Sequence, residues 1–518
     1  MERRKFLRNT TLASMSIPFM FKNWNYAAVS EKLFSISRGA QDKVLVLIRL
    51  NGGNDGLNTI IPMDYYSNLV KQRANIIIPE NKLIAITPKN AFHPSMTGMA
   101  TMFQQGKLGI VQNVGYPEQN RSHFRSMDIW TSGSLDVTTT SGWLGRHLDK
   151  EHPGFPEAYP DVENPDPFAI SMGYEVSATC QGLMSNFSHT VVNPSSYFTS
   201  TSSSSVNDGT YYGSHMEFLS TIIAQTNKYG QRVYDATKNV KNLSTKYDSK
   251  NDLATQLKYV AQMIRGGLKT NVYILNINGF DNHDSQVNTT DVTTGKHADL
   301  LKTLSDAISA FQDDLTLMGI DKRVAGMTFS EFGRQIASNA SVGTDHGDAA
   351  PLFLFGSCLS QPIYGSNPII SDQVKNQAGV PMQIDFRDVY ASILKDWFEV
   401  PVNEIQSMFS HTITYHSLMG ACTLSLEENP FDQHKTILYP NPASQHITLR
   451  LTSKNEQVKI SIVDLQGKEQ GVYYDATFVN ETHELPINIS DLAFGSYMVQ
   501  IQKTSGNETI SFIKVKEN

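Results

Sequence analysis

The sequence has no basic tract and no long apolar stretch, and these two absences exclude several classes of protein. Its 518 residues include 43 lysines and arginines against 50 aspartates and glutamates, a mild formal net charge of -7. A chain without clustered positive charge is a poor match for nucleic acid as its main partner. No segment is long and apolar enough to predict a transmembrane helix, so we expect no membrane span.

Cysteine is also scarce. Cys180, Cys358 and Cys422 lie far apart in the sequence. They form neither a metal-binding pattern nor a disulfide framework, and one of the three must stay unpaired. A redox or nucleophilic role is the alternative, but we favour the interpretation that they are small buried residues.

The two ends of the chain differ from its middle. Residues 1–40 carry Arg3, Arg4 and Lys5 before a short apolar run, which predicts an export signal that resembles the twin-arginine type. A chance arginine pair is the alternative. From about residue 427 short alternating segments are separated by turn residues. We expect an α/β domain over 41–425, a linker over 426–435 and a small all-β sandwich over 436–518.

The middle of the chain joins apolar runs to polar clusters. Residues 43–50 predict a central strand, and an Asn-Gly-Gly-Asn-Asp-Gly turn carrying Asp55 follows it. This turn is either a metal- or anion-binding loop or a plain turn of the Asn/Asp-Gly kind. Residues 297–318 and 385–397 have the apolar spacing of amphipathic helices. The first of these helices is expected to connect two parallel strands.

Carboxylates and imidazoles stand next to three further apolar runs. Asp281 and His283 follow the first run, Glu331 ends the second, and Asp345 and His346 precede the third. In open α/β sheets ligands gather at the carboxyl ends of the strands. Carboxylates and imidazoles that converge there are the groups that a divalent metal needs. The sequence therefore predicts a metal site at this edge of the sheet.

The segment 121–130 offers groups for ester chemistry. Ser122 becomes a nucleophile if a metal or a base activates its hydroxyl, and His123 can act as a base or a ligand. Arg121 and Arg125 could hold an anionic substrate, because guanidinium matches phosphate and sulfate oxygens. The alternative is a helix capped at Ser122 with solvated arginines, and the residues alone favour it.

Six motifs in this chain resemble the bacterial domain of unknown function 1501 family over about residues 40–420. They lie at 47–58, 121–130, 142–146, 279–283, 328–334 and 343–347. That family is similar to the alkaline phosphatase and sulfatase superfamily. The resemblance therefore implies an α/β fold with a mixed, mostly parallel sheet flanked by helices. It also implies a divalent metal, zinc or manganese, as one or two ions.

The superfamily pattern can be carried over position by position. Asp55 stands near the first ligand position, although Asn51 directly follows the strand, and Ser122 resembles the nucleophile. Asp281 and His283 resemble the first metal pair.

The second metal pair departs from the pattern, because Glu331 and Phe332 stand where the superfamily has aspartate and histidine. His346 then resembles the late histidine. In a rival alignment Asp345 and His346 are the second pair and the late histidine is His411 or His416. We prefer the first alignment, because the helix at 385–397 should follow the last ligand.

A second resemblance concerns the C-terminus. The Tyr-Pro-Asn-Pro sequence at 439–442 and the β-rich segment after it resemble the type A sorting domain of the type IX secretion system. This implies handling by the type IX machinery and an extracellular or outer-surface location.

Together the two resemblances imply an exported metal-dependent hydrolase of phosphate or sulfate esters. Ser122 would attack, and Arg121 or Arg125 would hold the anion of a small ester or of a sulfated or phosphorylated glycan. The alternative is a non-catalytic surface binding protein that keeps the same fold. Asn51 and Phe332 are its support, since both depart from the catalytic pattern.

Overall fold

The computed structural model describes the chain in three parts, with short gaps in the last: 42–196, 208–420 and 436–516, without 440–442, 454, 465–467, 480–481 and 505. The predicted export signal at 1–40 and the predicted linker at 426–435 lie outside the described residues. The chain divides into two compact units, one of Ile36–Leu424 and one that contains Ser425–Asn518. No helix in the described parts combines the length and apolarity that crossing a bilayer requires.

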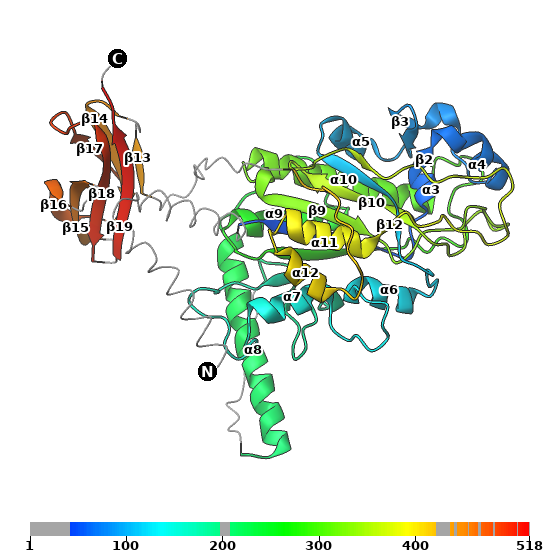
Figure 1. The fold of residues 1–518 in the computed structure, drawn as a ribbon, viewed down its shortest axis with the longest axis horizontal. Coiled ribbons are helices and arrows are strands. Elements are labelled where there is room, and N and C mark those ends of the chain that lie inside the picture. Colours follow the sequence, from blue (N-terminus) through cyan, green and yellow to red (C-terminus); the bar gives the residue numbers. More distant parts are fainter. Residues whose placement is uncertain are drawn as a thin grey trace. The chain divides into compact units, whose positions relative to one another are not determined.

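The larger unit is built on one mixed, mostly parallel sheet (Figure 1). Its strand order is β11-β5-β10-β9-β1-β8-β6-β7, and β12 pairs with β5. The strands are β1 (Val44–Asn51), β5 (Leu108–Gly115), β6 (Ala169–Met172), β7 (Ser188–Val191), β8 (Val272–Asn278), β9 (Val324–Phe329), β10 (Ala350–Gly356), β11 (Ile363–Tyr364) and β12 (Ile384–Asp385). The predicted fold class, an α/β domain on such a sheet, is confirmed.

Strand β1 is apolar on both faces because both are covered by helices. Val44, Val46 and Ile48 pack into one core, and Leu45 and Leu47 pack into the other. Successive side chains of a strand point to opposite faces, so a strand covered on both sides needs a continuous apolar run. The central position that the sequence predicts for this strand is confirmed, since β1 lies between β8 and β9.

Two sets of helices cover the sheet. The core of Val44 and Val46 is closed by α5 (Thr97–Gln104), α9 (Asp252–Arg265) and α10 (Lys296–Leu317). The core of Leu45 and Leu47 is closed by α6 (His123–Ser132), α7 (Trp143–Glu151), α11 (Phe386–Asp396) and α12 (Val402–Met408). Both predicted amphipathic helices are present as α10 and α11. The remaining elements of this unit include α3 (Gly56–Thr59), α4 (Tyr66–Gln72), α8 (Tyr211–Thr237) and a small sheet of β2 (Ile60–Pro62), β3 (Ile84–Thr87) and β4 (Asn90–Phe92).

Strand β10 runs antiparallel to both of its neighbours, β5 and β9. Its apolar run predicts a buried strand but carries no information on direction. As a result, the loop that precedes β10 lies at the same edge as the carboxyl ends of β1, β8 and β9. That loop carries Asp345 and His346, so the reversal brings them to the predicted metal edge.

The C-terminal unit consists of two antiparallel sheets around one apolar core. One sheet has the order β13-β14-β17 and the other β16-β15-β18-β19. Ile447 and Leu449 from the first sheet pack with Ile460 and Val499 from the second. The strands are β13 (Ile437–Tyr439), β14 (His446–Thr452), β15 (Glu456–Asp464), β16 (Glu469–Phe478), β17 (Thr482–Asn488), β18 (Gly495–Lys503) and β19 (Gly506–Lys514). The predicted all-β domain is confirmed.

The cysteines differ from expectation in one respect. Cys358 is buried, as expected, but it is disulfide-bonded, so the interpretation that the cysteines form no disulfide is wrong for this residue. Cys180 is free and buried, and burial raises the pKa of its thiol to about 12. A thiol of this pKa is protonated at neutral pH and is a poor nucleophile.

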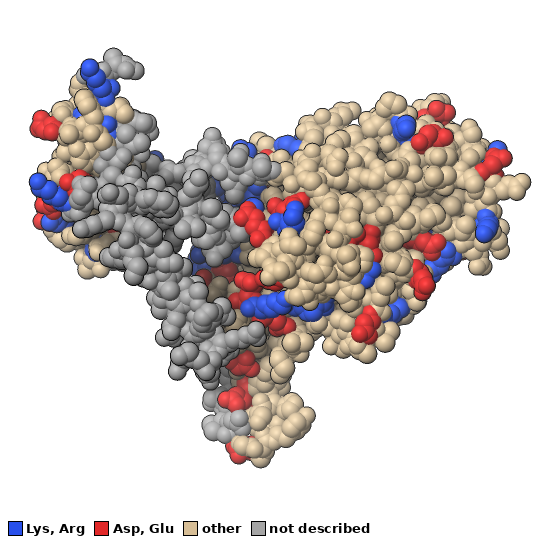
Figure 2. Space-filling model, in the orientation of Figure 1, with Lys and Arg blue, Asp and Glu red and all other residues tan. Residues whose placement is uncertain are grey.

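Charge is distributed evenly over the part of the surface in view. Figure 2 shows lysine and arginine side chains interspersed with aspartate and glutamate on the larger unit. Acidic and basic groups of this unit pair in several places, as in Lys246 with Asp313 and Lys302 with Asp306. Binding through one large field of a single sign is therefore not a feature of this face.

Candidate metal centre

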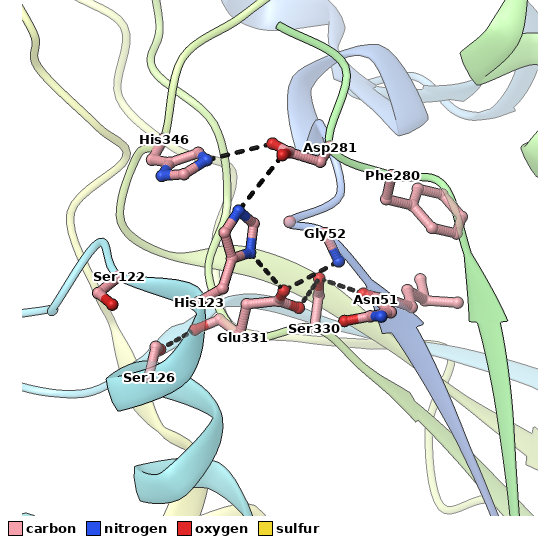
Figure 3. Close-up of polar contacts among 12 residues, drawn as sticks. Asn51, Gly52, Ser122, His123, Ser126, Phe280, Asp281, Ser330, Glu331 and His346 are labelled. Atoms are coloured by element: carbon pink, nitrogen blue, oxygen red, sulfur yellow. Dashed lines mark hydrogen bonds and ion pairs between the residues drawn. The ribbon is translucent and has the colours of Figure 1, made fainter.

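Four side chains meet at the predicted edge of the sheet. His123 is the first residue of α6, Asp281 and His283 lie in the loop after β8, and His346 lies in the loop before β10. Ligand atoms of His123, Asp281 and His346 all lie within 4.8 Å of one another, and Figure 3 shows both histidine rings turned toward the Asp281 carboxylate. The structure thus brings together residues from three separate segments.

The imidazole Nε2 atoms face one carboxylate. His123 Nε2 lies 3.4 Å from Asp281 Oδ2, and His346 Nε2 lies 3.1 Å from Asp281 Oδ1. His283 Nε2 lies 3.2 Å from the same Oδ1 and 2.9 Å from His346 Nε2. Three nitrogens and a carboxylate therefore converge on one small volume.

The opposite nitrogen of each ring is occupied by an acceptor. His123 Nδ1 donates to Glu331 Oε1 at 2.8 Å, and His283 Nδ1 donates to Asp345 Oδ1 at 2.8 Å. A carboxylate that accepts a hydrogen bond from one imidazole nitrogen fixes the tautomer, so the other nitrogen is unprotonated and has a free lone pair. Histidines that bind metals are oriented in this way.

His346 follows the same rule with a backbone partner. Its Nδ1 donates to the carbonyl oxygen of Arg121 at 2.8 Å. Burial lowers the pKa of His346 below its ordinary value, which favours the neutral ring. The lone pairs of His346 and His283 then face each other and the Asp281 carboxylate, and such a contact is stable only with positive charge between the groups. The donor set of three imidazoles and one carboxylate fits a divalent metal such as zinc.

Arg334 orients the aspartate of the cluster. Its guanidinium donates to Asp281 Oδ1 at 2.6 Å, and it also donates to the backbone carbonyls of Gly52, Gly53, Phe280 and Thr344. Partial burial tends to raise the pKa of Asp281, but the hydrogen bond and charge of Arg334 outweigh it and hold the pKa at about 2. The carboxylate is therefore ionised at neutral pH, as a ligand must be.

Gly52 allows the loops to approach this closely. Its φ is +121°, a conformation that L side chains rarely adopt. A Cβ at this position would lie 2.3 Å from the backbone nitrogen of Asp281. The Gly-Gly sequence after β1 thus serves the packing of the strand ends around the cluster.

Glu331 lies behind His123. It is fully buried, and its Oε1 accepts from the backbone N–H of Gly52 at 2.9 Å as well as from His123. Its carboxylate meets the Nδ1 side of the His123 ring, whereas Asp281 lies on the Nε2 side. This position favours a role in orienting His123 over the predicted role of metal ligand. Asp345 stands in the same relation to His283.

We expect Glu331→Gln to lower metal affinity by about 10- to 100-fold while all four converging side chains remain. The amide is a weaker acceptor for the His123 N–H, so the ring loses its fixed tautomer. Competition with a chromogenic chelator measures the change. Glu399→Gln is the matched control, because Glu399 pairs with Lys43 away from the centre. Equal affinity in Glu331→Gln and the wild type would contradict this role.

Asp55 is placed in a separate, buried network. Both of its oxygens accept from Arg73 Nη1, at 3.0 and 2.9 Å, and Oδ2 also accepts from Gln286. The structure therefore does not bring Asp55 to the cluster as the predicted ligand. Its ion pair with Arg73 ties the turn after β1 to the end of α4.

The two predicted anion-binding arginines are already engaged. Arg121 donates to both oxygens of Asp348 at 2.9 Å, and it also donates to a backbone carbonyl. Arg125 Nη2 donates to the carbonyl of Leu135 at 2.6 Å. Neither guanidinium contacts Asp281 in the described structure.

Ser122 precedes His123 at the start of α6, and its side chain makes no capping hydrogen bond. Figure 3 shows it beside the cluster with no polar contact to the other drawn residues. Phe332, which the resemblance aligns with a second histidine, packs with its ring centroid 4.9 Å from that of His123 and 4.5 Å from that of His346. An aromatic ring, and not a metal ligand, therefore lies on this side of the cluster.

The rival alignment finds no support in the described contacts. His411 Nε2 pairs with Asp388 of α11 at 3.0 Å, and the backbone N–H of His416 donates to Ser392. Sequence reasoning missed Arg334, although it is the last residue of the motif at 328–334. The available signal was a charged residue that follows a carboxylate and a glycine within this motif.

Comparison with known proteins agrees with the two-part organisation. Residues 42–409 match the family described as "Protein of unknown function (DUF1501)", and residues 437–516 match the "Secretion system C-terminal sorting domain". No curated protein sequence gives a significant match. The sorting domain indicates secretion through the type IX system to the cell surface or the extracellular space.

Solved structures with similar folds are distant in sequence. A protein in the alkaline phosphatase superfamily from Vibrio parahaemolyticus is 8% identical, with 80% of this chain and 76% of that chain covered and a TM-score of 0.33. The PsFucS1 sulfatase from Pseudoalteromonas sp. is 10% identical, with coverage of 89% and 87% and a TM-score of 0.32. Likeness at this level is loose and says nothing about activity. On the match over 42–409, the chain belongs to the DUF1501 family, and it carries a secretion sorting domain after that region.

Proposed function

We propose that this chain is an exported metal-dependent hydrolase of phosphate or sulfate esters. The observation that carries the proposal is the convergence of three imidazole Nε2 atoms on the Asp281 carboxylate, with each Nδ1 held by an acceptor. His123, His283, His346 and Asp281 would hold one zinc or manganese ion. Such an ion supplies Lewis-acid polarisation of an ester oxygen.

Among the described residues, three serine hydroxyls near the cluster differ in whether they are free to react. Ser126 is buried and donates to the Glu331 carbonyl, and Ser330 donates to the Leu50 carbonyl at 2.7 Å. Both hydroxyls are therefore held within the structure. Ser122 is exposed and free of side-chain hydrogen bonds in the described structure, so it can approach an ester bound next to His123.

Ser122→Ala is expected to lower ester hydrolysis by about 10³-fold or more, because removal of a nucleophile eliminates the covalent route. Metal content should not change, since the serine is not a ligand. Initial rates on aryl phosphate and aryl sulfate, measured beside metal content, test this. Thr138→Ala, at an exposed hydroxyl further along the chain, is the control. Unchanged hydrolysis would exclude Ser122, and a metal-loaded wild type that is inactive on both esters would exclude the hydrolase.

A second function is favoured by one observation. Phe332 packs on His123 and His346 where a second metal would need a ligand. A surface protein that binds a sulfated or phosphorylated glycan through a single ion, without turnover, is compatible with that arrangement. Saturable glycan binding together with inactivity of the metal-loaded protein would select this function.

A further inference from the structure

Arg49 of β1 is a cation with too few partners. Its Nη2 donates to Asn51 Oδ1 at 2.7 Å. Its Nε is buried and has no hydrogen-bond partner among the described residues. A guanidinium carries five N–H donors, and no described carboxylate forms an ion pair with this one. Nearby Arg73, Arg121 and Arg334 each pair with an aspartate.

The shortage of partners costs free energy. Burial lowers the pKa of Arg49, and the charges of Glu331 and Glu175 offset this only in part. A partly buried charge without a hydrogen-bonded counterion is unfavourable. An anion that reached the guanidinium would remove that penalty on binding.

On β1 and β8, the side chains beside Arg49 are uncharged amides. In the register of β1 with β8, Arg49 lies opposite Asn276 and Asn51 lies opposite Asn278. These positions share one face of the sheet, because alternate residues point the same way. Asn51 Nδ2 donates to Asn278 Oδ1 at 2.9 Å, and the side chains of Asn276 and Asn278 are exposed. The four residues form a polar patch that no carboxylate of β1 or β8 interrupts.

Asn51, a member of the polar patch, is connected to the candidate metal centre by the next residue of the chain. Asn51 is followed by Gly52, whose N–H donates to Glu331 Oε1, and Glu331 in turn accepts from His123. Figure 3 shows Asn51 on the side of Glu331 that faces away from Ser122. A group held by Asn51 would therefore lie on the Glu331 side of the candidate centre.

We propose that Arg49, with Asn51 and Asn278, forms a subsite for a tetrahedral oxyanion, a sulfate or phosphate group of the substrate other than the one that Ser122 attacks. The guanidinium provides paired donors for two oxygens, and the exposed amide of Asn278 provides a third. The assignment of this anion to a substrate rests on the proposed hydrolase. Its binding at Arg49 does not require turnover.

The test is titration calorimetry of inorganic sulfate and, separately, inorganic phosphate into the zinc-loaded full chain at constant ionic strength. Arg49→Gln is expected to weaken binding of the anion that binds more tightly by at least tenfold. Arg49→Lys is expected to weaken it less, because lysine keeps the positive charge but lacks the paired N–H donors. Arg323→Gln removes the same charge next to Asp42, at the amino end of β9, whereas Arg49 lies near the carboxyl end of the parallel β1; this variant should bind as the wild type does. The preferred anion identifies the charged group that this subsite recognises.

Two results would overturn the inference. In the first, Arg49→Gln binds the anion as tightly as the wild type does, while His346→Ala loses binding. That result would place the anion on the metal alone and would leave the proposed hydrolase intact. The other is no binding of either anion to the wild type, whatever the hydrolysis assay gives. If Arg49→Gln fails to fold by circular dichroism, Asn278→Ala, at an exposed position, is expected to weaken the anion several-fold, and unchanged affinity there would contradict the subsite.

Discussion

Asp281→Ala is expected to abolish tight metal binding and to lower ester hydrolysis by about 10³-fold or more, since the metal contributes several kcal/mol to the transition state. Its carboxylate is the point on which the three histidines converge and to which Arg334 donates. Without it the imidazoles lose their common anionic partner. Plasma mass spectrometry after dialysis and initial rates on phosphate and sulfate esters measure the two effects.

Asp284→Ala is the matched control for this substitution. Asp284 is also exposed, lies three residues further along the same loop and pairs with Lys296. It should retain the metal and the rate of the wild type. If Asp281→Ala kept both its metal and its hydrolysis, the centre would not be where the structure places it.

Arg73→Met is expected to lower the free energy of unfolding by about 3–5 kcal/mol, because it leaves a buried carboxylate without its partner. Arg73 and Asp55 are both fully buried, and Arg73 also donates to the carbonyls of Gln335 and Ile336. Urea unfolding followed by tryptophan fluorescence measures the change in the larger unit, which holds Trp130, Trp143 and Trp397. Lys71→Met, at an exposed ion pair with Asp372, should cost at most about 1 kcal/mol.

The pH dependence gives this prediction an independent check. Burial tends to raise the pKa of Asp55, but Arg73 and other partners hold it below its ordinary value. A carboxyl with a lowered folded pKa adds stability above its unfolded pKa of about 4, and that stability is lost as the pH falls through the folded pKa. In Arg73→Met burial becomes the dominant influence on the pKa of Asp55 and raises it. Protonation of Asp55 in acid should therefore reduce the loss of stability that the substitution causes. A variant that lost stability in acid as steeply as the wild type would contradict the pairing.

The sequence was most informative where burial dictates the residues. Strand β1 and helices α10 and α11 were predictable because their apolar spacing follows directly from two covered sheet faces and from helical periodicity. Strands β16 and β17 were not, since their exposed positions carry many polar residues and give a weak alternating signal. The direction of β10 was unpredictable as well, because an apolar run reads the same both ways.

The sequence predicted which residues form the candidate site better than it predicted what each of them does there. Strand-end position was enough to select Asp281, His283 and His346, which the structure brings together. It could not tell that Glu331 and Asp345 face the Nδ1 side of two histidines, because that depends on ring orientation. Asp55 was selected by its turn, yet its partner Arg73 comes from beyond α4, and no local pattern links the two.

The antiparallel course of β10 also decides when the centre can exist. His346 reaches the other ligands only once β10 has inserted between β5 and β9, and His123 and Glu331 meet across 208 residues of chain. On the proposed function, a nascent or partly folded chain would therefore have no preformed affinity for the ion, and loading would be coupled to completion of the sheet. In a secreted protein the metal taken up would then depend on the cations present in the compartment where folding finishes.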